Sequence, residues 1–244
     1  MWWALATRPA IHHRGSVIPS HDLRANMCGP PYDDDDFFLD SAVAQARTLM
    51  KAVELTDRTR IVDVGCGLGR LAIGLARERP QVRYLGLDSQ EQFIWWCSRY
   101  VQRAHPGFRF RHLDVENERY NPAGRKIAGD FRLPVADADA DVVVLWGVLT
   151  NMAPEHMPIY VSEIGRLLRP GGRALLTAFV EKGVPAASIN PSGYVPYQCV
   201  GPLHVVRYEE GYLRSVFATH SLSVRAFSYE MVDVKQSEFQ LEKR

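Results

Sequence analysis

The chain has 244 residues, of which 46% are hydrophobic and 23% are charged. Since domains average about 150 residues, this length predicts one large domain with an elaboration and excludes a mini-protein that depends on disulfides or metal. Its 29 basic and 28 acidic side chains give a net charge of +1, so composition provides no reason to expect a nucleic-acid partner.

The cysteines and the first residues bear on cellular location. No two cysteines have the spacing of a metal site: Cys28, Cys66, Cys97 and Cys199. We therefore expect free thiols and no bound metal. The apolar opening of the chain ends at Arg8 and Pro9, too early for a signal peptide or a membrane span. A cytoplasmic protein is the expectation.

Residues 1–36 mix proline, histidine, glycine and charge without clear periodicity, and we treat them as an N-terminal extension. They end in four consecutive aspartates, which can cap the helix that follows. From residue 37 to residue 55, apolar side chains recur at alternating steps of four and three. This spacing predicts an amphipathic helix with one face on the core.

The rest of the chain alternates strand and helix patterns. The predicted strands are 61–64, 82–87, 108–113, 141–146, 173–179, 221–229 and about 237–242. The predicted helices run through 71–76, 91–104, 155–168 and 209–219. Helical connections of this kind favour an α/β fold with a doubly wound, seven-stranded, mostly parallel sheet. The continuous apolar run at 141–146 is typical of a strand buried on both faces.

Residues 181–208 are rich in proline, glycine, tyrosine and serine and are long for a connection inside a compact domain. Such an insertion is usually a lid or a binding loop. We therefore divide the chain into the extension 1–36 and one domain, 37–244, that carries a lid insertion at 181–208.

A glycine-rich turn follows the first predicted strand, with Gly65, Gly67 and Gly69 at alternate positions. Glycines there let the backbone approach a ligand closely, beside the amides of a helix N-terminus. An ordinary tight turn is the alternative. The dinucleotide fingerprint needs a further glycine where this chain has Arg70, which disfavours a nicotinamide or flavin site.

Three aspartates lie in phase at the strand ends: Asp63, Asp88 and Asp114. Because the carboxyl ends of parallel strands share one sheet edge, Asp88 should lie beside the glycine turn, where it can accept from both hydroxyls of a ribose. Asp114, one strand further, can accept from an adenine amine. A single aspartate at such a place is more often a helix cap, but three in phase favour an adenosine-type ligand.

These motifs resemble the class I S-adenosylmethionine-dependent methyltransferases, whose domain is a seven-stranded Rossmann-like sheet, and within them a bacterial small-molecule type. The resemblance covers about residues 37–180 and is carried by 62–70, 84–88, Asp114, 163–173 with its Pro-Gly-Gly turn, 94–97, 120–124 and 148–152.

The resemblance implies that S-adenosylmethionine is the cofactor, S-adenosylhomocysteine the product, and no metal is required. The resemblance also implies which residues contact each part of the cofactor. The methionine part would contact Asp63, Gly65, Cys66, Gly67 and Gly69, and the ribose would contact Asp88 and Ser89. The adenine would contact Asp114 and Val115, and the methyl group would lie beside Trp146 and Gly147.

Methyl transfer is an in-line displacement, so positioning of the acceptor contributes most, and a hydroxyl acceptor also gains from a base. The candidate bases are His156, with His204 and Glu181 from the insertion. The alternative to a catalytic role is that His156 is a surface residue in the first turn of a helix. Related sequences often carry a histidine where this chain has Asn151, so a base at that position is absent.

A second motif resembles the Pro-Pro-aromatic element of methyltransferases that act on amino groups: Gly29-Pro30-Pro31-Tyr32. It lacks the Asn, Asp or Ser at its head and follows no apolar strand. We interpret it as a loop before the first long helix.

The expected acceptor is a small molecule, methylated on a hydroxyl oxygen of a natural product, sugar or lipid-like compound. Aromatic residues of the extension and insertion could wall its pocket: Trp2, Trp3, Tyr32, Phe37, Phe38, Tyr194 and Tyr197. Nothing in the sequence separates oxygen from nitrogen or carbon as the acceptor atom, and a homodimer is left open. A noncatalytic cofactor-binding module and a nucleotide-binding oxidoreductase stay as alternatives.

Overall fold

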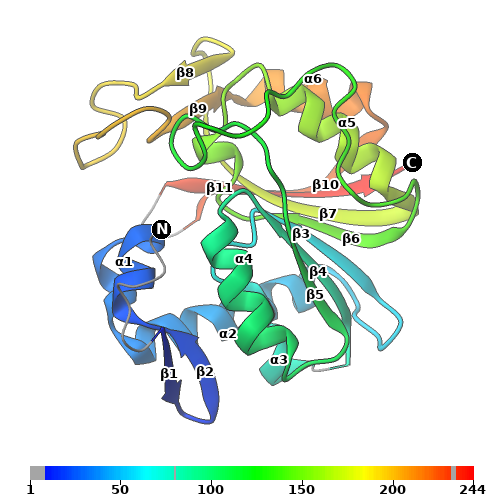
Figure 1. Ribbon diagram of the computed structural model, residues 1–244. Coiled ribbons are helices and arrows are strands. Elements are labelled where there is room, and N and C mark those ends of the chain that lie inside the picture. The colour runs from blue at the N-terminus through cyan, green and yellow to red at the C-terminus, as the bar shows by residue number, and fades with distance from the viewer. Residues whose placement is uncertain (1–8, 80, 232–234) are drawn as a thin grey trace.

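The structure is a computed structural model that describes residues 9–79, 81–231 and 235–244 (Figure 1). Its central sheet has the strand order β10-β11-β7-β6-β3-β4-β5. Neighbouring strands from β7 to β5 are parallel, whereas β11 is antiparallel to both β7 and β10. The predicted α/β fold with a seven-stranded, mostly parallel sheet is confirmed.

The strands of this sheet lie close to their predicted positions: β3 (Arg60–Val64), β4 (Arg83–Asp88), β5 (Phe108–His112), β6 (Ala140–Leu145), β7 (Leu168–Glu181), β10 (Leu222–Met231) and β11 (Gln236–Lys243). The helices before and between them are α2 (Asp35–Ala52), α3 (Arg70–Glu78), α4 (Glu91–Cys97), α5 (Met157–Leu167) and α6 (Glu210–Thr219). The predicted helix 91–104 changes at Ser98 into a π-helix, η2 (Ser98–Gln102). β7 begins five residues earlier than predicted, and its pairing with β6 is irregular between Leu168 and Arg173.

Helices cover both faces of the sheet, with α2, α3 and α4 on one face and α5 and α6 on the other (Figure 1). The central strand β6 supplies both cores in alternation. Val142 and Val144 pack with the first group of helices, and Val143 and Leu145 pack with the second. This alternation explains why the strand is continuously apolar.

One crossover has no helix. Residues 113–139, between β5 and β6, form turns and isolated bridges only, although every other parallel crossover from β3 to β7 carries a helix. Residues of this loop and of the start of α5 line a cavity at the carboxyl ends of the strands.

The N-terminal extension has more regular structure than its sequence predicted. It contains a hairpin of β1 (Ala10–His13) and β2 (Ser16–Pro19), then α1 (His21–Cys28) and the 3-10 helix η1 (Pro30–Asp33). Asp34 caps α2 by accepting a hydrogen bond from the Phe37 amide at 2.7 Å, so the capping expectation is confirmed. Trp2 and Trp3 lie outside the described residues.

The insertion at 181–208 is partly ordered. β8 (Ala187–Ile189) pairs antiparallel with β9 (Val206–Glu209), and β9 runs parallel to the end of β7, which brings the whole sheet to nine strands. Tyr194, Val195 and Val205 pack on Phe179 in a small core of their own. A role of this segment as a lid stays a prediction.

Two further observations concern the described part of the chain. None of its helices is both long enough and apolar enough to cross a membrane. Its cysteines Cys66, Cys97 and Cys199 are free thiols, while the Cys28 side chain lies outside what the structure describes.

Candidate functional site

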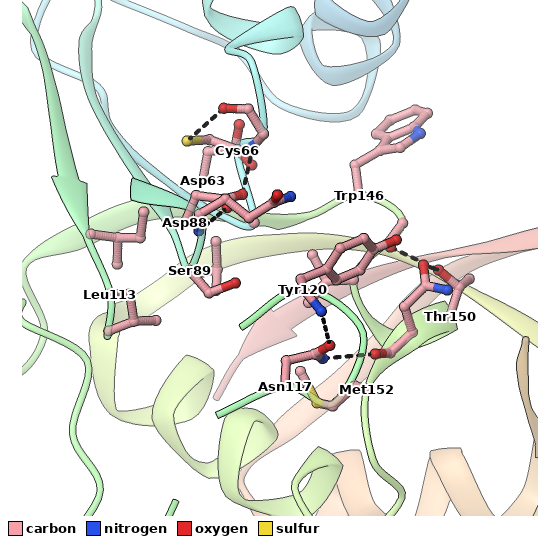
Figure 2. Close-up of a pocket in the computed structure, with 18 of the residues that line it drawn as sticks. Asp63, Cys66, Asp88, Ser89, Leu113, Asn117, Tyr120, Trp146, Thr150 and Met152 are labelled. Atoms are coloured by element: carbon pink, nitrogen blue, oxygen red, sulfur yellow. Dashed lines mark hydrogen bonds between the residues drawn. The ribbon is translucent and has the colours of Figure 1, made fainter. Parts of the chain in front are cut away.

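A cavity of about 360 Å³ opens at the carboxyl ends of β3, β4, β5 and β6 (Figure 2). Ten of the residues predicted to form the site line it: Asp63, Gly65, Cys66, Gly67, Asp88, Ser89, Val115, Trp146, Gly147 and His156. The remaining predicted residues do not line it: Gly69, Asp114, His204 and Glu181. The fold thus brings together segments that lie about ninety residues apart in the chain, from Asp63 to His156.

The glycine turn is fixed to the neighbouring strand. The amides of Gly65 and Cys66 both donate to the Leu87 carbonyl of β4, at 2.7 and 3.0 Å. Gly65 has a φ of +76°, and a Cβ there would lie 2.4 Å from Val148 Cγ2, so only glycine fits. Gly69 adopts the left-handed conformation as the N-cap of α3 and shapes the turn from outside the cavity lining.

Asp88 joins the glycine turn to the end of β4. Its two carboxylate oxygens accept hydrogen bonds from the amides of Gly67 and Gln90, each at 2.8 Å. Burial raises the pKa of Asp88, although these two amides favour the charged form. Because each carboxylate oxygen has more than one lone pair, Asp88 keeps acceptor capacity for hydroxyl groups in the cavity.

Asp63 is a buried carboxyl beside the same cavity. Burial raises its pKa to about 7, and the nearby Asp88 carboxylate adds to this, whereas the Tyr84 hydroxyl and Arg70 oppose it. The Tyr84 hydroxyl donates to Asp63 Oδ2 at 2.5 Å. A cation that entered the cavity near Asp63 would favour the charged carboxylate and lower this pKa.

In the sequence, Arg70 stands out only as the residue in place of a glycine, but its side chain lines the cavity. Its guanidinium donates to the Tyr32 hydroxyl at 2.7 Å and to Gln45 Oε1 at 3.2 Å, and it lies 5.1 Å from the centre of the Tyr32 ring. Among the described residues no carboxylate forms an ion pair with it. Arg70 opens α3, where the helix dipole disfavours a cation, and that placement is the sequence signal for an anionic ligand.

Asp114 is not among the residues that line the cavity. Its carboxylate lies 3.4 Å from Asn121 Nδ2 and 3.4 Å from Arg125 Nε, and about half of its side chain is exposed. The loop without a helix instead contributes its neighbour Val115, together with Asn117 and other residues that the sequence did not assign to the site: Glu116, Tyr120 and Ile127.

The far side of the cavity is formed by the segment after β6 and by the start of α5, as Figure 2 shows for Trp146, Thr150 and Met152. Asn151 acts here as a brace. Its Nδ2 donates to the carbonyls of Leu203 and His204 at 2.9 and 2.8 Å, and its own carbonyl accepts from Asn117 Nδ2 at 2.9 Å. The segment after β6 is thereby tied to both the insertion and the loop.

Of the three candidate bases, only His156 lines the cavity. It precedes α5, and Tyr160, one helical turn later, lines the cavity as well. His204 accepts a hydrogen bond from the Val200 amide at 2.7 Å, and burial lowers its pKa. Glu181 pairs with Arg207 at 2.6 Å, so both insertion residues have partners elsewhere.

The aromatic residues expected to wall an acceptor pocket divide in the same way. Tyr32 lines the cavity. Phe38 is fully buried in the core, and Tyr194 packs on Phe179. Phe37 and Tyr197 are about half exposed. The described residues contain no cluster of three or more side chains suited to a metal ion.

Residues 61–172 match the family model described as a methyltransferase domain. They include the glycine turn, both buried aspartates and the Pro-Gly-Gly element. Residues 61–172 thus form a methyltransferase domain. The resemblance noted in the sequence is thereby confirmed.

Two curated relatives illustrate the extent of the similarity. A trans-aconitate 2-methyltransferase from Azoarcus sp. (strain BH72) is 30% identical over 145 residues, which cover 59% of this chain and 49% of the relative. A fatty-acid O-methyltransferase from Mycolicibacterium smegmatis is 32% identical over 124 residues, which cover 48% of this chain and 36% of the relative. The match thus spans half or less of these relatives' length.

Solved structures extend the comparison to the fold. The PH0226 protein from Pyrococcus horikoshii has a TM-score of 0.61 at 13% identity, covering 91% of this chain and 99% of its own. The [4+2]-cyclase SpnF has a TM-score of 0.60 at 16% identity, and the match covers 84% of this chain and 81% of the SpnF chain. A SAM-dependent methyltransferase from Methanosarcina mazei has a TM-score of 0.54 at 17% identity, covering 78% of this chain and 94% of that structure, so the chain has the methyltransferase fold over most of its length.

The raised pKa of Asp63 predicts a specific dependence of stability on pH. A carboxyl that is harder to ionise in the folded chain destabilises the fold as pH rises from about 4 to above 7, by about 4 kcal/mol for a folded pKa of about 7. Asp63→Asn removes this term and keeps an acceptor for the Tyr84 hydroxyl. Denaturant unfolding of the ligand-free protein should show the variant gaining about 4 kcal/mol relative to the parent between about pH 4 and 8.

Asp57→Asn, in an exposed turn, is the matched control and should show no such gain. Equal pH dependence in the parent and in Asp63→Asn would contradict the placement of Asp63 as a buried, desolvated carboxyl.

Proposed function

We propose that the chain transfers the methyl group of S-adenosylmethionine to an oxygen atom of a small molecule. The observation that carries the proposal is the set of charges around one cavity. A buried carboxyl suits a cation, Asp88 offers oxygens to hydroxyl groups, and Arg70 donates to neutral groups, with no ion pair to any described carboxylate. S-adenosylmethionine combines an ammonium, a carboxylate and two ribose hydroxyls in one ligand.

The cofactor contacts follow from these chemical preferences. Asp88 and Ser89 would hold the ribose. The backbone from Gly65 to Gly69 would hold the methionine part of the cofactor, and Asp63 would hold the ammonium group of that part. Arg70, with Tyr32 and Gln45, would hold its carboxylate. Val115 and the backbone of Asp114 would border the adenine.

The chemistry rests on position and on one base. When bound, the cofactor supplies an electrophilic methyl group. Trp146 and Gly147 would border it, and the surrounding side chains hold the acceptor in line with the bond that breaks. His156, on the same cavity, would take the proton of a hydroxyl acceptor, because a neutral imidazole has a nitrogen that can accept a proton.

The names of the relatives support a small oxygen-bearing acceptor. One is named for trans-aconitate and another as a fatty-acid O-methyltransferase. Both names denote compounds with carboxyl groups. A noncatalytic cofactor-binding module stays as the alternative. SpnF, with the same fold, is named as a cyclase, so the fold by itself does not establish methyl transfer. The match of residues 61–172 to a methyltransferase domain argues against the nucleotide-binding oxidoreductase, which the sequence had left as an alternative.

Asp88→Ala tests the ribose contact. Loss of two charge-assisted hydrogen bonds should weaken binding of S-adenosylmethionine and S-adenosylhomocysteine about 100-fold, or about 3 kcal/mol. Calorimetric titration measures this loss, and thermal unfolding verifies that the variant is folded. Asp130→Ala, on the exposed part of the loop, should bind like the parent. A change of less than about threefold in Asp88→Ala would show that the ribose binds elsewhere.

His156→Ala tests the base. Cofactor affinity should be unchanged, while turnover of a hydroxyl acceptor should fall on the order of 100-fold or more. Turnover of a carboxylate acceptor such as trans-aconitate should be unaffected, because a carboxylate carries no proton to remove. His12→Ala, on the exposed face of β1, is the control. Equal losses with both classes of acceptor would remove His156 as the base.

A further inference from the structure

A short relay of hydrogen bonds connects the backbone beside Trp146 to the start of β11. The Gly147 amide donates to Thr177 Oγ1 at 2.8 Å, and the Thr177 hydroxyl donates to Gln236 Oε1 at 2.8 Å. Thr177 is only 2% exposed and lies in β7. Gly147 and Gln236 both line the cavity, so the relay runs behind its wall.

The hydrogen bond from Thr177 fixes which half of the Gln236 amide faces the strand. A backbone N–H can only donate, so Thr177 Oγ1 accepts from Gly147 and has one proton left to give. That proton goes to Gln236 Oε1, the acceptor half of the amide. Gln236 Nε2, the donor half, makes no hydrogen bond to any described residue. Since Gln236 lines the cavity, its unengaged polar group there is an N–H donor.

We propose that Gln236 Nε2 positions the acceptor by donating to its reacting atom, and that it thereby selects oxygen over neutral nitrogen. This inference rests on the proposed function. An alcohol or carboxylate oxygen has at least two lone pairs, so one can attack while another accepts from Nε2. A neutral amine has a single lone pair, which the attack itself requires. A donor at this place therefore favours oxygen acceptors.

The transfer balances with the groups already described. The acceptor oxygen forms the new C–O bond, and the S–C bond breaks with its electron pair moving to sulfur, which becomes a neutral thioether. A hydroxyl acceptor loses its proton to the His156 imidazole, whereas a carboxylate acceptor has none to lose. Gln236 exchanges no proton and acts only by direction and distance.

The test follows the side-chain amide signal of Gln236 by nuclear magnetic resonance. In ¹⁵N-labelled protein with S-adenosylhomocysteine present, the signal is assigned by its loss in Gln236→Met. Phenol and aniline serve as probes because they share one shape and are both neutral at pH 7, and formate serves as a carboxylate probe. We expect phenol and formate to shift the signal, with aniline binding about fivefold more weakly or not at all.

Two sets of variants separate positioning from structure. Thr177→Val breaks the relay and should abolish the preference for phenol over aniline, whereas Thr177→Ser keeps the hydroxyl and should preserve it. Gln240→Met, in the same strand but outside the cavity lining, should behave like the parent. An aniline shift equal to that of phenol, or a signal that neither phenol nor formate moves, overturns the proposal. Calorimetric binding of S-adenosylhomocysteine to the same samples tests the proposed function separately.

Discussion

The hydrogen bond from the Gly67 amide to Asp88 is the contact on which the site depends. It joins the turn after β3 to the end of β4, and the Gln90 amide holds the second carboxylate oxygen on the other side. Register makes this contact possible, because parallel pairing sets Val64 opposite Leu87 and so ends both strands at one edge. A carboxylate used in this way shapes the turn and still presents acceptors to the cavity.

The charged side chains around the cavity also indicate which ligand it binds. Asp63 is a buried carboxyl whose pKa is raised, and among the described residues Arg70 hydrogen-bonds to the neutral groups of Tyr32 and Gln45. Buried charges of this kind are costly unless a partner compensates them. A zwitterionic amino-acid end on a nucleoside supplies both partners at once. A dinucleotide supplies phosphates instead, which would lie against two buried carboxyls.

The sequence predicted the features that depend on local periodicity and missed those made by distant residues. The seven strands and the place of Asp88 follow from apolar runs and from glycine spacing. Arg70 was missed because its partners, Tyr32 and Gln45, lie 38 and 25 residues before it in the chain. Gln236 was missed for the same reason, since Thr177 precedes it by 59 residues. Phe38 was expected at a pocket, yet helical spacing with Ala42 and Ala46 already placed it in the core.

Binding of the cofactor with release of a proton is the most direct test of this account. The protein is titrated at pH 7 with S-adenosylmethionine, S-adenosylhomocysteine and NADH, in two buffers of different ionisation enthalpy. Because the pKa of Asp63 is about 7, the ammonium of either adenosyl ligand should displace about half a proton, and Asp63→Asn should abolish that release. Micromolar binding of both adenosyl ligands with this release, and none of NADH, is the expected result. Binding of NADH, or equal binding enthalpies in the two buffers, would contradict it.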